Sequence, residues 1–420
     1  MSASTSRGWA PEVFAPWPHT PGALLARVAA RSTAFDATGA GGGASVLIGS
    51  AAGVDTTDVG RRARGELMER MGNVLAGRGA EAEAEAGAGA GAGGARPPAS
   101  GVGTVRTCDW FTLRRDGVPA ADPGDPATGP VDVAHRGIPA REVRQLWCPG
   151  RETASGEDVW VPAGAAFLQH RPPPGCAATH RAGSTGVAAH GGPDAAAEHA
   201  AWEILERDLV RRSWCDPVRH PPVPFDARGA LPPGAGELRD LLDRESLGAT
   251  ALALPSPAGA EAVAVSVHGP DRAHQTFGAG CGPAHAFPET VARACWEALM
   301  VRWSMSAPVA VLAWDRLSRT GTPRTGLDHA LWTFHAQDAL EHWIGPVTSL
   351  RDPPRPAPRT IRDASPLAVL AAHTGREVIA VDRCAGPPAD EGLAVVRLIA
   401  PGASPLPARP VPGVPPHPFG

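Results

Sequence analysis

Three segments of the chain repeat apolar residues at the spacing of a helix. The first covers residues 60–75, and its apolar positions are Leu67, Met68, Met71, Val74 and Leu75. The second begins at Pro193, directly after two Gly, and extends to about residue 214. The third covers residues 288–303 and also begins with Pro. Proline suits the first turn of a helix, where its missing N–H would have no partner. The pattern therefore predicts three helices.

Short runs of apolar and β-branched residues lie before, between and after these helices and predict strands. They cover residues 45–48, 251–254, 262–267, 378–381 and 393–399. A chain of 420 residues can bury a sizeable core. Helices mixed with such strands favour an α/β (α+β) domain over an all-α one.

Three stretches fall outside this pattern and suggest the limits of the domain. Residues 1–21 are polar and rich in Pro, so we expect a flexible N-terminal arm. Residues 79–100 have low complexity and almost nothing to bury, which is typical of a flexible surface insertion. Residues 404–420 are rich in Pro and predict an extended C-terminal tail. One main domain would then cover residues 22–403.

Composition narrows the classes of function. None of the 39 basic residues is Lys, which removes the phosphate-binding loop that needs Lys after its last Gly. A net charge of -4 and the absence of a basic run argue against nucleic-acid binding. No apolar run approaches the roughly 18 residues of a membrane span. The seven Cys are scattered and never form a CxxC pair, which favours a reduced, cytoplasmic location.

Each predicted helix carries acids and Arg three or four residues apart, which places them on one face of the helix. They are Glu66 and Glu69 in the first helix, Glu203, Glu206 and Arg207 in the second, and Arg293 and Glu297 in the third. Charge pairs on solvated faces would also give this spacing, at about 0.2–0.5 kcal/mol each. However, the acids of the second and third helices lie among Ala, Ile, Leu and Trp. Carboxylates in such surroundings are costly unless they are paired or bind a metal.

Around these acids, the sequence resembles the central signature of YcaO proteins. Residues 184–189 (STGVAA), followed at the family's distance by residues 203–208 (EILERD), are similar to S-N-G-L-A-A and E-x-x-E-R-D. Residues 65–70 (GELMER), 293–297 (RACWE) and 392–402 (GLAVVRLIAPG) resemble three further elements of the family in the same order. The chain ends PHPFG, where the family often has P-H-P-F-P.

The resemblance implies the YcaO fold, with mixed sheets packed by helices that hold ATP and Mg²⁺. By motif position, the residues on the metal side would be Glu66, Glu69, Glu203, Glu206 and Glu297. The residues that contact the nucleotide would be Arg207, Arg293, Arg62 and Ser184. Residues of the tail that contribute to catalysis would be Pro416, His417 and Pro418.

The implied reaction is ATP-dependent cyclodehydration of Cys, Ser or Thr in a ribosomally made precursor peptide to thiazoline or oxazoline rings. A separate ubiquitin-activating-like protein would bind the leader of that peptide, because the chain is too short to contain such a module. No nucleic acid and no membrane are expected as partners, and a homodimer stays open. The same activation used to make a thioamide or an amidine is an alternative.

Several positions depart from the family pattern. The family's G-K-G is Ala51-Ala52-Gly53 here, and its G-N-T is His190-Gly191-Gly192. A Ser expected four residues before the first Glu is Arg62, and a Gln expected after Glu297 is Met300. We expect Arg61 or Arg62 to replace part of the missing Lys charge. The departures also leave open a scaffold or partner subunit that has lost nucleotide binding.

Overall fold

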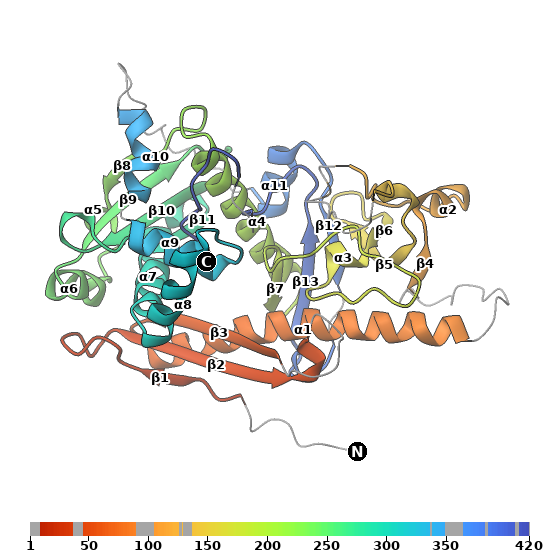
Figure 1. Cartoon of the computed structure of the whole chain (residues 1–420), viewed down its shortest axis with the longest axis horizontal. Coiled ribbons are helices and arrows are strands. Elements are labelled where there is room, and N and C mark those ends of the chain that lie inside the picture. Colours follow the sequence, from red (N-terminus) through yellow and green to blue (C-terminus); the bar gives the residue numbers. More distant parts are fainter. Residues whose placement is uncertain are drawn as a thin grey trace.

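The computed structural model describes residues 9–36, 45–89, 105–125, 128, 137–336, 338–348, 364–382, 385–407 and 411–419. These residues form three sheets with helices packed against their faces (Figure 1). Helices packed on several sheets confirm the α/β (α+β) fold class. The named strands within each sheet pair antiparallel, so the described sheets are antiparallel rather than mixed. Among the helices that the structure describes, none has the length and apolar character of a membrane span.

The three sheets have three, four and six strands. The first has the order β1 (Glu12–Phe14), β2 (Leu24–Ser32), β3 (Ser45–Gly53). The second has the order β11 (Thr276–Gly282), β10 (Glu261–His268), β9 (Gly248–Leu254), β8 (Val223–Asp226). The third has the order β4 (Arg106–Cys108), β5 (Gln145–Glu152), β12 (Ile379–Asp382), β13 (Ala394–Ile399), β7 (Val187–His190), and β6 (Asp158–Pro162) also pairs with β5.

Three long helices pack against these sheets, namely α1 (Thr56–Gly89), α4 (Pro193–Cys215) and α7 (Phe287–Met305). Helix α4 runs between the sheet of β8–β11 and the strands β7 and β13 (Figure 1). The remaining helices are α2 (Trp110–Arg115), α3 (Ala163–Ala166), α5 (Ala227–Ala230), α6 (Gly236–Arg244), α8 (Pro308–Thr320), α9 (Gly326–Ala336), α10 (Ala339–Thr348), α11 (Pro366–Thr374) and α12 (Pro387–Asp390).

Helix α1 is longer than the sequence pattern predicts. It continues to Gly89 rather than ending near Leu75, so part of the low-complexity segment is helical. Buried Glu81 explains the extension, because it accepts hydrogen bonds from Arg78 at 2.7 Å and from the main chain of Arg171 at 2.7 Å. The local pair with Arg78 and the tertiary contact with Arg171 together outweigh the weak helix propensity of the Gly residues in this segment. Residues 90–100 of the predicted insertion lie outside the described residues.

The predicted strands are all present, but β7 and β11, which precede α4 and α7, were not predicted. Residues 45–48 belong to the longer β3, and the other predicted runs correspond to β9, β10, β12 and β13. Strand β7 is short and strand β11 (TFGAGCG) is rich in Gly, so neither has the apolar pattern that identifies a strand. In the predicted N-terminal arm, residues 12–14 form β1 and pair with β2, and residues 1–8 lie outside the described part.

Candidate active site

Each of the three long helices follows a strand that lies at the edge of its sheet. Among the described residues, β3, β7 and β11 are edge strands, and α1, α4 and α7 pack beside them. An edge strand carries main-chain N–H and C=O groups that have no strand partner. In this molecule the helices supply side chains to those groups, which fixes the helices relative to the sheets.

One Glu from each helix accepts a hydrogen bond from such an edge. The amide of Ser50 donates to Oε2 of Glu66 at 2.6 Å. The amide of Gly186, just before β7, donates to Oε2 of Glu203 at 2.9 Å. The amide of Ala279 in β11 donates to Oε2 of Glu297 at 2.9 Å. Three predicted acids are therefore each fixed by a main-chain amide at, or just before, the edge strand of a different sheet.

The units around α1 and α7 repeat each other in detail. An added Cβ on Gly49 would lie 2.0 Å from the carbonyl oxygen of Ala63, and one on Gly278 would lie 2.1 Å from that of Ala294. In both units the residue that follows this Gly, Ser50 or Ala279, donates its amide hydrogen to a Glu of the helix. That Glu, Glu66 or Glu297, lies three residues after the contacted Ala. Only Gly lets the helix approach the strand closely enough for this bond.

The repeat includes an Arg one helical turn before each Glu. Nη2 of Arg62 donates to the carbonyl oxygen of Ala52 at 2.7 Å. Nη2 of Arg293 donates to the carbonyl oxygen of Cys281 at 2.9 Å. Ala52 and Cys281 each lie two residues after the amide that binds the Glu. Arg62 is therefore the structural counterpart of Arg293.

The carboxylates influence one another strongly. Burial raises the pKa of Glu69 well above its usual range, and the charges of Glu203 and Glu66 raise it further. Burial raises the pKa of Glu206 to about 7, although Arg207 opposes the shift. Burial also raises the pKa values of Glu66 and Glu203. The five predicted acids therefore form one electrostatic group.

Arg207 lies at the centre of this group. Its Nε is 3.4 Å from Oε1 of Glu206, and its Nη2 is 3.5 Å from Oε1 of Glu297. Burial lowers the pKa of Arg207, but Glu206, Glu297 and Glu203 more than offset this and raise it overall. Its Nη1 is buried without a hydrogen-bond partner in the described structure. A buried cation with an unused donor and long contacts to two acids suits an oxyanion such as a phosphate.

The donor chemistry of the site fits Mg²⁺. Within the described residues, no three His, Cys, Asp or Glu side chains come together tightly enough to hold a metal ion by themselves. Mg²⁺ usually takes only one or two carboxylates and completes its shell with phosphate oxygens and water. Crowded carboxylates with raised pKa values are an arrangement that a divalent cation would stabilise. The role of each Glu as a ligand stays a prediction.

Ser184 lies in the turn that leads into β7. It is half-buried, and its carbonyl oxygen accepts a hydrogen bond from the amide of Val187 at 3.0 Å. Two residues later, Gly186 has φ of +82°, a conformation that favours Gly, and its amide binds Glu203. The S-T-G run therefore shapes the turn that fixes Glu203. Contact between Ser184 and a nucleotide stays a prediction.

The C-terminal tail lies against the same site. Phe419 is buried next to Phe277 and Trp343, and the guanidinium of Arg207 lies 6.0 Å from the centre of its ring. Pro418 is buried and Pro416 is half-buried. The tail thus forms part of the wall around Arg207.

His417 organises the tail. Its Nε2 lies 3.0 Å from the carbonyl oxygen of Pro407, and its Nδ1 accepts from the amide of Phe419 at 3.3 Å. Its ring stacks on that of His329 in α9, with centroids 4.1 Å apart. Burial lowers the pKa of His417 to about 3, and His329 lowers it further, so the ring is neutral. Both ring nitrogens are engaged within the tail, which points to positioning rather than proton transfer in this conformation.

Sequence reasoning missed two residues that shape the site. Asp208 is fully buried and accepts from Arg212 at 2.7 Å and from the main chain of Ser404 at 2.9 Å, so it ties the start of the tail to α4. Nε2 of His373 lies 2.7 Å from the same carboxylate. Arg397 in β13 binds the turn that precedes β7. Both residues lie inside quoted motifs, and only their apolar settings could have marked them.

Comparison with known proteins identifies the family. Residues 61–404 match the family model described as YcaO cyclodehydratase, ATP- and Mg²⁺-binding. A search of curated proteins finds no match. Among solved structures, YcaO from Methanopyrus kandleri bound with AMPPCP and Mg²⁺ has 18% identity and a TM-score of 0.56, over 94% of this chain and 86% of that one.

Two further structures have a similar fold. A heterocyclase in complex with substrate and cofactor has 17% identity and a TM-score of 0.58, over 86% of this chain but only 45% of that one. A chain of the Escherichia coli microcin synthetase McbBCD complex has 12% identity and a TM-score of 0.58, over 96% of this chain and 90% of that one. At these identities the likeness concerns the fold. With its family match, the chain belongs to the YcaO cyclodehydratases, which bind ATP and Mg²⁺.

Proposed function

We propose that the chain makes thiazoline or oxazoline rings from Cys, Ser or Thr residues of a ribosomal precursor peptide. The observation that carries the proposal is the group of five buried or half-buried acids around Arg207, whose unused Nη1 is available for a phosphate oxygen. The acids occur at the family's motif positions and come from three helices. The solved structures with this fold include a heterocyclase with substrate and a microcin synthetase, which supports a peptide substrate.

In the proposed reaction, a Cys, Ser or Thr side chain of the peptide loses its proton and attacks the preceding carbonyl carbon. The oxygen of that carbonyl accepts the γ-phosphoryl group of ATP and leaves as phosphate, and loss of the amide proton completes the C=N bond. Arg207 and Arg293 would bind phosphate oxygens, and positioned charge of this kind accounts for most catalysis in phosphoryl transfer. Mg²⁺ held by Glu66, Glu203 or Glu297 would neutralise the phosphates.

The tail would contribute by closing the site around the peptide. Pro416 and Pro418 restrict the backbone, which lowers the entropy lost when the tail is ordered. The hydrogen bonds of His417 fix its shape, and Phe419 covers Arg207. Removal of residues 417–420 should abolish ring formation while Mg²⁺·ATP still binds. Unchanged ring formation in the shortened chain would mean that the tail is only a terminus.

A precursor peptide encoded beside the gene, a leader-binding partner of the ubiquitin-activating-like type and Mg²⁺·ATP supply the test. Mass spectrometry should show loss of one water per ring, and released phosphate should match the number of rings. Exchange of oxygen for sulfur or gain of an amine would instead assign the thioamide or amidine chemistry. Glu203→Gln should retain the fold and lose activity.

A nucleotide-free scaffold is the second candidate, favoured by Ala51-Ala52-Gly53 and by the missing Asn at residues 190–192. Calorimetry with the purified chain and a Mg²⁺·ATP analogue separates the two functions. Saturable binding that Glu203→Gln weakens supports the enzyme. Absence of binding in a folded chain, together with activity of the partner complex, supports the scaffold.

A further inference from the structure

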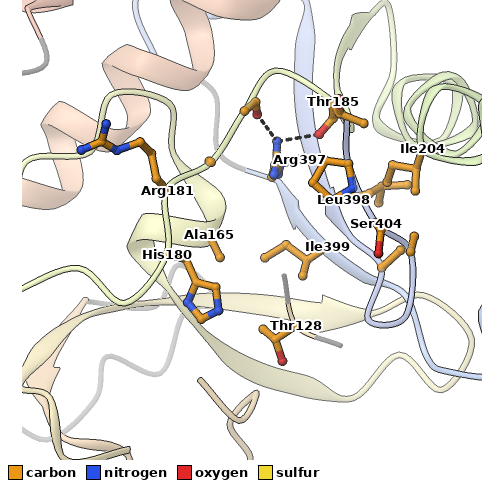
Figure 2. A pocket seen from close by; sticks show the side chains of 15 residues that line it. Thr128, Ala165, His180, Arg181, Thr185, Ile204, Arg397, Leu398, Ile399 and Ser404 are labelled. Atoms are coloured by element: carbon orange, nitrogen blue, oxygen red, sulfur yellow. Dashed lines mark hydrogen bonds between the residues drawn. The ribbon is translucent and has the colours of Figure 1, made fainter. Parts of the chain in front are cut away.

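A pocket of about 90 Å³ lies beside the turn that binds Glu203 (Figure 2), and none of the five acids is among its described lining residues. Its walls come from β13, from Ile204 of α4, from residues 180–185 and from residues 403–405 at the start of the tail. Nothing in the proposed reaction uses this pocket. It is therefore a candidate for a second ligand.

The polar side chains of the described lining residues are hydroxyl, imidazole and guanidinium groups, each of which can donate a hydrogen bond. They are the side chains of Thr128, His180, Arg181, Thr185, Arg397 and Ser404. None of the described residues that line it is Asp or Glu. The exposed side chain of Arg181 points away from the pocket (Figure 2). The cation at the pocket is therefore Arg397, and with no acid among the described lining residues its charge favours an anion.

Arg397 is the lining residue best placed to bind an anion. Its Nη1 donates to the carbonyl oxygens of Gly183 and Thr185, both at 2.7 Å (Figure 2). Its Nε is buried and has no hydrogen-bond partner among the described residues. Burial lowers the pKa of Arg397 to about 10, and Glu203 offsets this only in part. The guanidinium is thus charged at neutral pH, and within the described part of the chain it forms no salt bridge, which is costly.

The rest of the wall is apolar. Ile204, Leu398, Ile399 and Pro405 supply most of it. A bare phosphate would leave this surface in contact with water, whereas an anion joined to an apolar group would cover it. Apolar walls with a few placed polar groups are typical of sites for organic ligands.

We propose that the pocket binds an oxyanion through Arg397, and that its apolar walls favour a carboxylate carried by an aliphatic or peptide group. A carboxylate of the peptide substrate and the phosphate product of the reaction share this chemistry. The turn at residues 183–186 bonds both Arg397 and Glu203, so the ligand would lie one turn away from the acids.

Ligand-observed NMR with hexanoate, inorganic phosphate and hexanol tests the proposal. The full chain is saturated with a Mg²⁺·ATP analogue, so that anions do not bind at the nucleotide site. Hexanoate should bind and hexanol should not. Arg397→Gln should weaken hexanoate binding at least about tenfold, equivalent to roughly 1.4 kcal/mol, and Arg397→Lys should restore part of it. Binding of phosphate but not hexanoate, with the same dependence on Arg397, would identify the phosphate product as the source of the oxyanion.

A matched pair of variants separates the effect of an added negative charge from the effect of added bulk. This test can be made even if Arg397→Gln does not fold. Ala182 lines the pocket. Ala182→Glu places a carboxylate inside it and should abolish hexanoate binding, whereas Ala182→Gln adds the same bulk without charge and should retain it. Equal binding of hexanol and hexanoate, or equal loss in both Ala182 variants, would overturn the proposal. Nucleotide binding by the same variants reports on the proposed function separately.

Discussion

The units β2–β3–α1 and β10–β11–α7 use one backbone arrangement for different chemistry. Each has an antiparallel strand pair, a Gly beneath the helix, and an amide that binds Glu66 or Glu297. In α1 a second acid, Glu69, follows one turn later, and at the same position α7 has Met300. The α1 unit therefore contributes two of the predicted acids, and the α7 unit contributes one.

The Arg residues of the two units also differ in their neighbours. Arg62 pairs with Asp58 at 2.8 Å, and both side chains are well exposed. Arg293 lies close enough to Glu206 to lower its pKa. The backbone of each unit determines the position of its Glu. The neighbouring side chains determine which charged groups lie near that Glu. Four predictions test this division, from the largest expected effect to the smallest.

Glu297→Gln should cause the largest loss. The amide side chain keeps an oxygen for the amide of Ala279, so the fold persists while the negative charge is lost. Turnover of Mg²⁺·ATP should fall about 10²–10³-fold, the range seen when one electrostatic contact to a transition state is removed. Glu66→Gln should cost less, because Glu69 remains on α1. Exposed Glu289→Gln on α7 is the control. A larger loss for Glu66→Gln would contradict the comparison.

The pH dependence of stability should reveal the titration of Glu206, whose pKa is influenced by Glu297 and Arg293 of the α7 unit. Burial raises the pKa of Glu206 from 4.5 to about 7. A raised pKa in the folded state contributes stability that is complete below pH 4.5 and lost as the pH rises through 7. Without Mg²⁺, the free energy of unfolding should therefore fall across this range, by on the order of 3 kcal/mol.

Glu206→Gln should flatten that part of the curve, measured by urea unfolding at several pH values. Exposed Glu198→Gln on the same helix should leave it unchanged. A wild-type slope in Glu206→Gln would show that other groups carry the effect.

Gly49→Ala and Gly278→Ala test the shared backbone. In both units a Cβ would overlap a helix carbonyl oxygen. Both variants should lose about 1–3 kcal/mol of stability, the usual cost of overpacking, because backbone atoms cannot move aside easily. Gly65→Ala in α1 has no atom within 4 Å and should instead gain about 0.5–1 kcal/mol. Urea unfolding measures all three, and clearly unequal losses for Gly49 and Gly278 would break the equivalence.

The sequence predicted the acids better than the supports that hold them. Glu203 and Glu297 stand out because they interrupt apolar helices, and periodicity finds such helices readily. The supports are main-chain amides at Ser50, Gly186 and Ala279, whose side chains carry no signal. Strand β11 is rich in Gly because the helix lies so close to it, and this removes the apolar pattern that would identify a strand. The repeat could be seen only when the hydrogen bonds were compared.

Tertiary contacts explain the remaining differences. The extension of α1 depends on Glu81 accepting from the main chain of Arg171, which only the fold brings close to it. The position of Phe419 against Arg207 depends on ring contacts with Phe277 and Trp343, which are far apart in the sequence. Local patterns predict elements, and they do not predict which elements meet.

The smallest expected effect concerns Arg62 and decides whether the two units bind nucleotide alike. If Arg62 acts as the counterpart of Arg293, Arg62→Gln and Arg293→Gln should each weaken Mg²⁺·ATP binding about tenfold, equivalent to roughly 1.4 kcal/mol. Arg61 is the matched control, because it is next in sequence and bonds the same Asp58 but lacks the bond to Ala52. Arg61→Gln should leave the dissociation constant unchanged, as measured by calorimetry. Lys at position 62 keeps the charge and should recover part of the affinity, since it lacks the planar fork of Arg. Equal affinity in wild type and Arg62→Gln, with a clear loss in Arg293→Gln, would mean that the α1 unit shares only the backbone of its counterpart and that the missing Lys has no replacement at this position.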